Sequence, residues 1–224
     1  MTSRPHDIRT VLFDLDGTLA DTAPDLAHAL NAVLQEQGRA ALPFSSIRPV
    51  VSHGGIALIK HGFGIDESHP DFSLLRQRLL EIYRENIARE TRLFEGMEEL
   101  LLQLESRGLN WGVVTNKPEW LTEPLLQQLG IRQRAATVVS GDTLPQSKPH
   151  PAPMLLACQQ AGSEALQCLY VGDAQRDIEA GRNAGMATLV ALFGYLGEND
   201  HPEQWQADGM IRHALEILDW LEQC

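Results

Sequence analysis

Five short apolar segments, separated by stretches with helical spacing, constrain the fold of this chain more than any other feature. The segments are residues 10–16 (TVLFDLD), 111–115 (WGVVT), 136–140 (ATVVS), 168–172 (CLYVG) and 187–191 (ATLVA). Helical patterns alternate with the later segments, near residues 96–107, 119–129, 151–161 and 175–184. Strands that are apolar on both faces are typical of a parallel sheet covered by helices on both sides. The sequence therefore predicts an α/β fold with a doubly wound parallel sheet.

The stretch from residue 21 to about residue 89 interrupts this alternation, because it holds no strand-like segment. Its apolar residues recur at three- and four-residue spacing instead, first at Leu26, Ala29, Leu30, Val33 and Leu34 and then at Leu75, Leu79, Ile82 and Tyr83. We expect an all-helical cap domain of residues 21–89, inserted into a core domain formed by residues 1–20 and 90–224.

Polar side chains with catalytic potential follow several of the predicted strands. They are carboxylates, a hydroxyl, an amide and an ammonium group: Asp14, Asp16, Thr115, Asn116, Lys148, Asp173 and Asp177. Ligands of open parallel sheets bind outside the carboxyl ends of the strands. We therefore expect these side chains to surround one site.

Several carboxylates at one site would repel one another unless a cation lay between them. A hard cation such as Mg²⁺ binds carboxylate and phosphate oxygens, and lysine and threonine supply charge and hydrogen bonds to a phosphoryl group. Asp14 and Asp16, two residues apart on an extended segment, can face the same site, and Gly17 allows the backbone to approach a ligand closely. One carboxylate can act as a nucleophile and the other as a general acid and base.

Each of these residues alone is an ordinary turn, loop or capping residue, but their combination resembles the four motifs of the haloacid dehalogenase-like superfamily. The matching segments are residues 14–19 (DLDGTL), 115–117 (TNK), 147–151 (SKPHP) and 172–177 (GDAQRD). Residues 177–186 (DIEAGRNAGM) resemble the extended fourth motif of the phosphoglycolate phosphatase-like branch. The resemblance covers nearly the whole chain and implies a Rossmann-like core with a helical cap.

The resemblance also implies roles for the individual residues. Asp14 would be the nucleophile that forms an aspartyl-phosphate, and Asp16 the general acid and base. Thr115 and Lys148 would hold the phosphoryl group, with Asn116 contributing through its backbone. The Mg²⁺ ligands would come from Asp14, Asp16, Asp173 and Asp177, with the Asp16 ligand being its carbonyl oxygen.

Substrate specificity in this branch resides in the cap, where Arg48 and His53 are candidates for binding a carboxylate of the substrate. Alternatively, Arg48 pairs with a surface acid and His53 caps a helix. Residues 50–55 (VVSHGG), 93–97 (LFEGM) and 111–118 (WGVVTNKP) are similar to the N-acetylmuramic acid 6-phosphate phosphatases of peptidoglycan recycling. The resemblance thus implies a phosphatase that acts on either 2-phosphoglycolate or N-acetylmuramic acid 6-phosphate, each of which carries a carboxylate.

Other functions within and outside this family remain open. Asp16 disfavours the dehalogenase and phosphonoacetaldehyde hydrolase branches, which lack an acid at that position. The latter branch carries a Schiff-base lysine in a cap of this kind, but we expect Lys60 to be a solvated helix residue. A sugar-phosphate mutase would use the same motifs, and a non-catalytic binding module would keep the fold.

The charge of the chain limits its partners. With 18 basic and 30 acidic residues the net charge is −12, which argues against binding of nucleic acid or anionic membranes but not of a small anionic metabolite. Residues 1–7 lack the apolar core of a signal peptide, and no apolar run is long enough to span a membrane. We expect a cytoplasmic protein, and the sequence predicts no particular oligomeric state.

Overall fold

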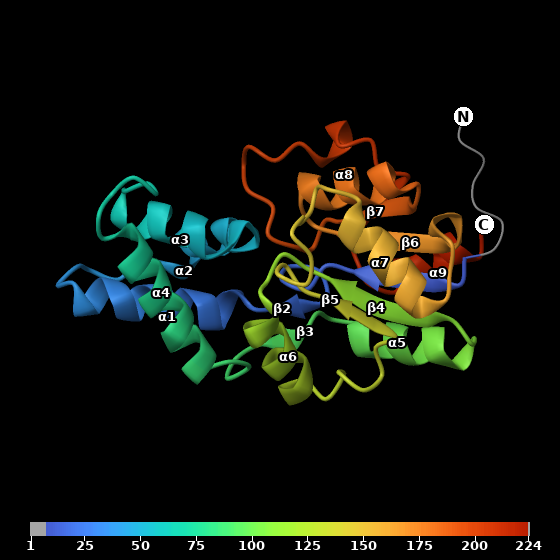
Figure 1. Cartoon of the computed structure of the whole chain (residues 1–224), viewed down its shortest axis with the longest axis horizontal. Coiled ribbons are helices and arrows are strands. Elements are labelled where there is room, and N and C mark those ends of the chain that lie inside the picture. Colours follow the sequence, from blue (N-terminus) through green and yellow to red (C-terminus); the bar gives the residue numbers. More distant parts are fainter. Residues whose placement is uncertain (1–7, 224) are drawn as a thin grey trace.

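Six parallel strands form the central sheet of the protein, in the order β5-β4-β1-β6-β7-β8 (Figure 1). The computed structural model describes residues 8–223, so the expectation drawn from residues 1–7 lies outside the described residues. The strands are β1 (Thr10–Phe13), β4 (Asn110–Val114), β5 (Thr137–Val139), β6 (Cys168–Gly172), β7 (Ala187–Ala191) and β8 (Gly209–Ile211). Counted along the chain, this is the 3-2-1-4-5-6 order of doubly wound folds, so the predicted fold class is confirmed.

The register of the central strands sets the position of the polar strand ends. Phe13 of β1 lies opposite Val113 of β4 and Val171 of β6. The residues that follow these strands therefore emerge at the same edge of the sheet. β1 and β6 flank the point at which the strand order reverses direction, where ligands of such sheets bind.

Helices cover both faces of the sheet because alternate strand residues point to opposite sides. Val11 and Phe13 belong to an apolar cluster that includes the helices on one face, whereas Leu12 belongs to a second cluster with helices of the other face. The first face carries α5 (Met97–Ser106), α6 (Glu119–Gln128) and α9 (Glu216–Leu221), and the second α7 (Ala152–Ala161) and α8 (Gln175–Ala184). Figure 1 shows α8 above the strands and α5 below them, while α7 overlaps the strands in this view.

The segment expected to form the cap is helical and projects from one end of the sheet (Figure 1). It contains α1 (Ala23–Glu36), α2 (Phe44–Ile47), the 3₁₀ helix η1 (Arg48–His53), α3 (Gly54–Phe63) and α4 (Phe72–Glu85). The apolar stripes noted in the sequence are buried where α1, α3 and α4 pack together. The short strands β2 (Ala20–Asp21) and β3 (Arg92–Leu93) pair antiparallel where the chain leaves and re-enters the core. The domain boundaries at residues 20/21 and 89/90 stay a prediction.

Three strands and two short 3₁₀ helices have no counterpart in the sequence pattern. The strands β2, β3 and β8 are two or three residues long, too short to produce a recognisable apolar run. The 3₁₀ helices are η2 (Ala165–Gln167) and η3 (Pro202–Gln204). Among residues 8–223, no helix combines the length and apolar character needed to cross a bilayer.

Candidate active site

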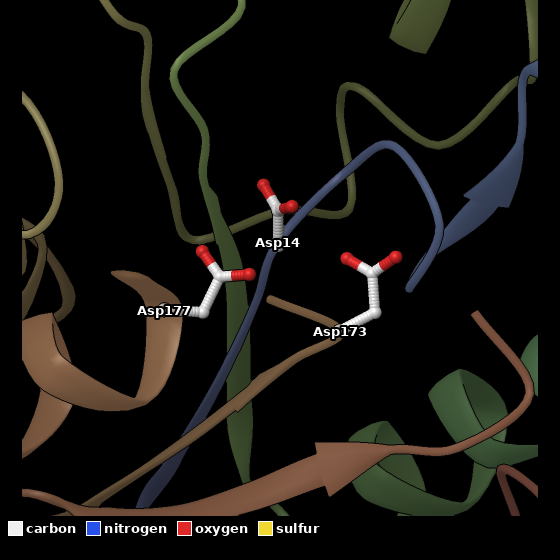
Figure 2. Close-up of side chains that lie close together, drawn as sticks. All are labelled: Asp14, Asp173 and Asp177. Atoms are coloured by element: carbon white, nitrogen blue, oxygen red, sulfur yellow. The ribbon is translucent and has the colours of Figure 1, made fainter. Parts of the chain in front are cut away.

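Three buried carboxylates converge at the carboxyl edge of the sheet (Figure 2). Asp14 directly follows β1, Asp173 directly follows β6, and Asp177 lies in the first turn of α8. One oxygen atom from each lies within 4.8 Å of the others. The other oxygen of Asp177, Oδ2, accepts a hydrogen bond of 3.0 Å from the backbone amide of Ala174, which helps to fix the start of the helix.

The electrostatics of this cluster fit a cation site. Oδ1 of Asp173 is buried and accepts no hydrogen bond, whereas the buried Oδ1 of Asp177 lies 2.8 Å from the ammonium nitrogen of Lys148. Burial, together with the charges of Asp14 and Asp177, raises the pKa of Asp173 to about 7. Burial also raises the pKa of Asp177, against the opposing effect of Lys148. Carboxylate oxygens that lack donors are the ligands that a hard divalent cation takes.

Lys148 places a buried ammonium group beside the same carboxylates. Its Nζ atom lies 2.8 Å from Oδ1 of Asp14 and 2.8 Å from Oδ1 of Asp177, and it also donates to the hydroxyl of Tyr170. The side chain of Asn116 holds the backbone of Lys148, accepting from its N–H and donating to its carbonyl oxygen, each at 3.0 Å. Asn116 thus positions the lysine through its side chain.

Asp16 is held at the edge of the site by two donors. Lys117 Nζ lies 2.8 Å from Oδ1 of Asp16, and the hydroxyl of Thr22 donates to the same oxygen at 2.6 Å. The ammonium group of Lys117 also lies 4.4 Å from the centre of the ring of Tyr83, which belongs to α4. Burial alone would lower the pKa of Lys117, but Asp16 and Tyr83 raise it above its usual value. Lys117 therefore links the carboxylate of the core to the cap as a cation.

The turn after β1 depends on Gly17. This residue has a φ of +89°, and a Cβ atom on it would lie only 2.1 Å from Oδ2 of Asp173. Any side chain there would displace Asp173, so Gly17 packs against a residue of the carboxylate cluster. Its predicted role in ligand binding stays a prediction. Thr115, also predicted to bind the phosphoryl group, lines the cavity and accepts a hydrogen bond from the backbone of Lys117 at 3.1 Å.

The cap contacts the core directly at this edge. The hydroxyl of Ser52 donates to Oδ2 of Asp173 at 2.6 Å. From α8, Arg176 donates to the carbonyl oxygen of Ser52 and lies 3.3 Å from Nδ1 of His53. Burial and the charge of Arg176 lower the pKa of His53, which favours its neutral form.

Of the cap residues singled out in the sequence, Arg48 and Lys60 lie outside the cavity wall and His53 lies in it. The guanidinium group of Arg48 donates to the carbonyl oxygens of Gly194 and Phe193, at 3.0 and 3.4 Å, and stacks over Tyr195. Its partners are backbone groups of the core rather than a surface acid. His53 precedes α3 without making a side-chain cap. Lys60 is exposed and pairs with Glu67 at 2.7 Å.

A cavity of about 370 Å³ lies between the core and the cap. Its core wall includes Asp14, Asp16, Thr115, Asn116 and Lys117, and its cap wall includes residues of η1, α3 and α4. Apolar side chains complete the lining: Leu26, Val51, Ile56, Leu80 and Leu121. The predicted catalytic residues thus face a space large enough for a small organic molecule.

Several residues of this site had no role assigned from the sequence. For Lys117, two sequence features could have indicated a place in the site: it is one of only three lysines in the chain, and it follows Thr115 and Asn116. Tyr170 had only its place within a strand. The contact between Ser52 and Arg176 joins residues 124 positions apart, so nothing in the local pattern could indicate it.

Comparisons with known proteins agree with this geometry. Residues 11–191 match the haloacid dehalogenase-like hydrolase family. The chain is 44% identical over 94% of both chains to the N-acetylmuramic acid 6-phosphate phosphatase of Pseudomonas putida. It is 45% identical to a phosphoglycolate phosphatase of Xanthomonas campestris pv. campestris, over 94% of this chain and 95% of that protein. A predicted phosphoglycolate phosphatase from Haemophilus somnus has a similar crystal structure, with a TM-score of 0.85, 29% identity and coverage of 98% and 99% of the two chains. The resemblance seen in the sequence is thereby confirmed, and the chain belongs to the haloacid dehalogenase-like hydrolase family.

Proposed function

We propose that this protein is a Mg²⁺-dependent phosphatase that hydrolyses a small phosphate ester through an aspartyl-phosphate on Asp14. Its class, phosphoric monoester hydrolase, agrees with the names of both curated relatives. The observation that carries the mechanism is the position of Asp14, a carboxylate that lines the cavity while Lys148 holds its Oδ1 atom at 2.8 Å.

In the first step, a carboxylate oxygen of Asp14 attacks phosphorus and the bond to the leaving oxygen breaks. Asp16 lines the same cavity and donates the proton that the leaving alcohol needs. In the second step, water attacks the phosphorus of the aspartyl-phosphate while Asp16 accepts a proton. Phosphate leaves and the carboxylate of Asp14 is restored.

Cationic and polar groups counter the charge of the phosphoryl group. Lys148 and Lys117 bring ammonium groups to Asp14 and Asp16, and Thr115 adds a hydroxyl on the cavity wall. Fixed positive charges in a buried site stabilise the transition state because they need no reorganisation during the reaction.

Asp14, Asp173 and Asp177 would hold Mg²⁺, since their oxygen atoms converge and the buried Oδ1 of Asp173 lacks a hydrogen-bond donor. When bound, the ion would offset the negative charge of the carboxylates and polarise the phosphoryl oxygens. The hydroxyl of Ser52 and the backbone amide of Tyr195 both donate to Asp173, at 2.6 and 2.8 Å, and so orient this carboxylate toward the site.

The size of the cavity supports N-acetylmuramic acid 6-phosphate over 2-phosphoglycolate as the substrate. Its volume of about 370 Å³ falls within the range of about 300–1,000 Å³ that is typical of sites for drug-sized ligands. A two-carbon leaving group would fill little of it and would leave the apolar lining in contact with water. An amino sugar that carries an apolar acetyl group and a lactyl ether would cover Leu26, Val51 and Leu80.

The test is to compare kcat/KM for the two substrates in the presence of Mg²⁺, with release of inorganic phosphate as the readout. We expect a preference of more than about a hundredfold for N-acetylmuramic acid 6-phosphate, or about 2.7 kcal/mol of discrimination. A preference for 2-phosphoglycolate would contradict the substrate assignment. Transfer of the phosphoryl group to a second sugar, without phosphate release, would indicate a mutase.

A further inference from the structure

The cavity wall contains an arginine, Arg76 on α4, whose guanidinium group has no partner among the described residues. Lys117 and Arg176 also line the cavity, but the first pairs with Asp16 and the second contacts Ser52 and His53. Throughout residues 8–223, the side chain of Arg76 has neither a hydrogen bond nor an ion pair. It is exposed, so its guanidinium group keeps all its donors available to a ligand.

The side chain of Arg76 lies beside Gly55, the second residue of α3. A Cβ atom on Gly55 would lie 3.7 Å from Cγ and 3.8 Å from Nε of Arg76, and 3.4 Å from a methyl group of Leu80. These are ordinary van der Waals separations, so the side chain of Arg76 packs against the cap wall at Gly55. Asp14 lies on the core side of the same cavity, so a ligand between the two walls can contact both.

Two other arginines of the cap, Arg48 and Arg78, have different surroundings. Arg48 donates to the carbonyl oxygens of Phe193 and Gly194 and does not line the cavity. Arg78 lies two residues beyond Arg76, which turns it to another side of the helix, where it forms paired hydrogen bonds with Glu36. Both guanidinium groups already have partners, whereas that of Arg76 does not.

We propose that Arg76 is the specificity-determining residue that binds the carboxylate of the leaving group. This inference rests on the proposed phosphatase function. A guanidinium group matches a carboxylate through two parallel hydrogen bonds. A single arginine on a cavity wall that also holds Ile56 and Leu80 suits a monoanion on an apolar stem better than a second phosphate, whose greater charge calls for more donors.

The test uses two substrates that differ in the carboxylate, N-acetylmuramic acid 6-phosphate and N-acetylglucosamine 6-phosphate. The second is the same sugar phosphate without the lactyl ether. In Arg76→Gln, we expect the ratio of kcat/KM for the first substrate over the second to fall by about ten- to a hundredfold. In the matched control Arg78→Gln, on the same helix and with the same loss of charge, the ratio should stay within about twofold of the wild type. A ratio that is unchanged in Arg76→Gln, or that falls equally in Arg78→Gln, would overturn the assignment.

The wild-type enzyme tests the substrate proposal separately. If it hydrolyses the two sugar phosphates at equal rates, or hydrolyses neither, the substrate proposal is wrong. The role of Arg76 is then measured by inhibition of aryl phosphate hydrolysis by lactate, a free monocarboxylate. Weaker inhibition of Arg76→Gln than of Arg78→Gln, by about tenfold or more, would support carboxylate binding at Arg76. Equal inhibition constants in the two variants would contradict it.

Discussion

Replacing Asp173 by asparagine should make the metal-free protein more stable at alkaline pH and abolish its stabilisation by Mg²⁺. In the folded protein, burial and the charges of Asp14 and Asp177 raise the pKa of Asp173 from its ordinary value of 3.8 to about 7. The folded state therefore holds this proton more tightly than the unfolded state. The contribution of this proton to the free energy of unfolding is fully present below about pH 4 and is lost as the pH rises through about 7.

The size of this loss of stability follows from the difference between the ordinary and the raised pKa of Asp173. Ionisation of Asp173 lowers the free energy of unfolding by about 4 kcal/mol in total, about 2 kcal/mol of it between about pH 5.5 and 8. Asparagine is neutral at every pH of this range, and its amide oxygen can still accept the hydrogen bonds from Ser52 and Tyr195. Weaker hydrogen bonds to asparagine should therefore lower the free energy of unfolding by about 1 kcal/mol at most.

The assay is urea denaturation of the wild type and Asp173→Asn in EDTA at several pH values, because the difference between the two proteins cancels the titration of groups that do not interact with Asp173. We expect the variant to gain about 2 kcal/mol relative to the wild type between about pH 5.5 and 8. Saturating Mg²⁺ should stabilise only the wild type, by about 3 kcal/mol at a hundredfold excess over Kd. A difference that does not change with pH, or a variant that Mg²⁺ stabilises as much as the wild type, would refute the reasoning.

Three other substitutions test separate parts of the site. Gly17→Ala should lower the free energy of unfolding by about 2–4 kcal/mol, because it combines a left-handed φ with a clash against Asp173; a loss below about 1 kcal/mol in urea denaturation would contradict this. Lys148→Met should lower the free energy of unfolding by about 3–5 kcal/mol in EDTA at pH 8, because it leaves buried carboxylates unpaired. A variant as stable as the wild type would argue against the ion pairs. Tyr83→Phe removes a buried hydroxyl that lacks a hydrogen-bond partner but keeps the ring beside Lys117, so its Tm should equal or exceed that of the wild type; a fall equivalent to more than about 1 kcal/mol would show that the hydroxyl is paired.

The core could be predicted from the sequence because its signals are local. The apolar segment before Asp14 and the segment before Asp173 each read as a buried strand, and parallel pairing brings their ends to one edge. The edge strand β8 was not predicted because it has only three residues, of which Met210 is exposed. Pairing of such a short segment is decided by its neighbour β7 rather than by its own pattern.

The cap side of the site could not be predicted in the same way. The resemblance made Arg48 and His53 of the cap the candidates for carboxylate binding, but the packing of η1 directs the side chain of Arg48 to Phe193 and Gly194. Arg76 reaches the cavity because α4 packs against α3 at Gly55, a contact between separate helices. The contacts of Ser52 with Asp173, and of Lys117 with Asp16, likewise arise only when the cap and the core meet.

The central claim is that Asp14 carries the phosphoryl group during turnover, and acid quenching followed by peptide mass spectrometry tests it most directly. With N-acetylmuramic acid 6-phosphate or an aryl phosphate as substrate and Mg²⁺ present, we expect one added phosphoryl group on the peptide that contains Asp14. The Asp14→Asn variant should show neither this adduct nor turnover. A phosphoryl group on another residue, or full activity of Asp14→Asn, would contradict the mechanism.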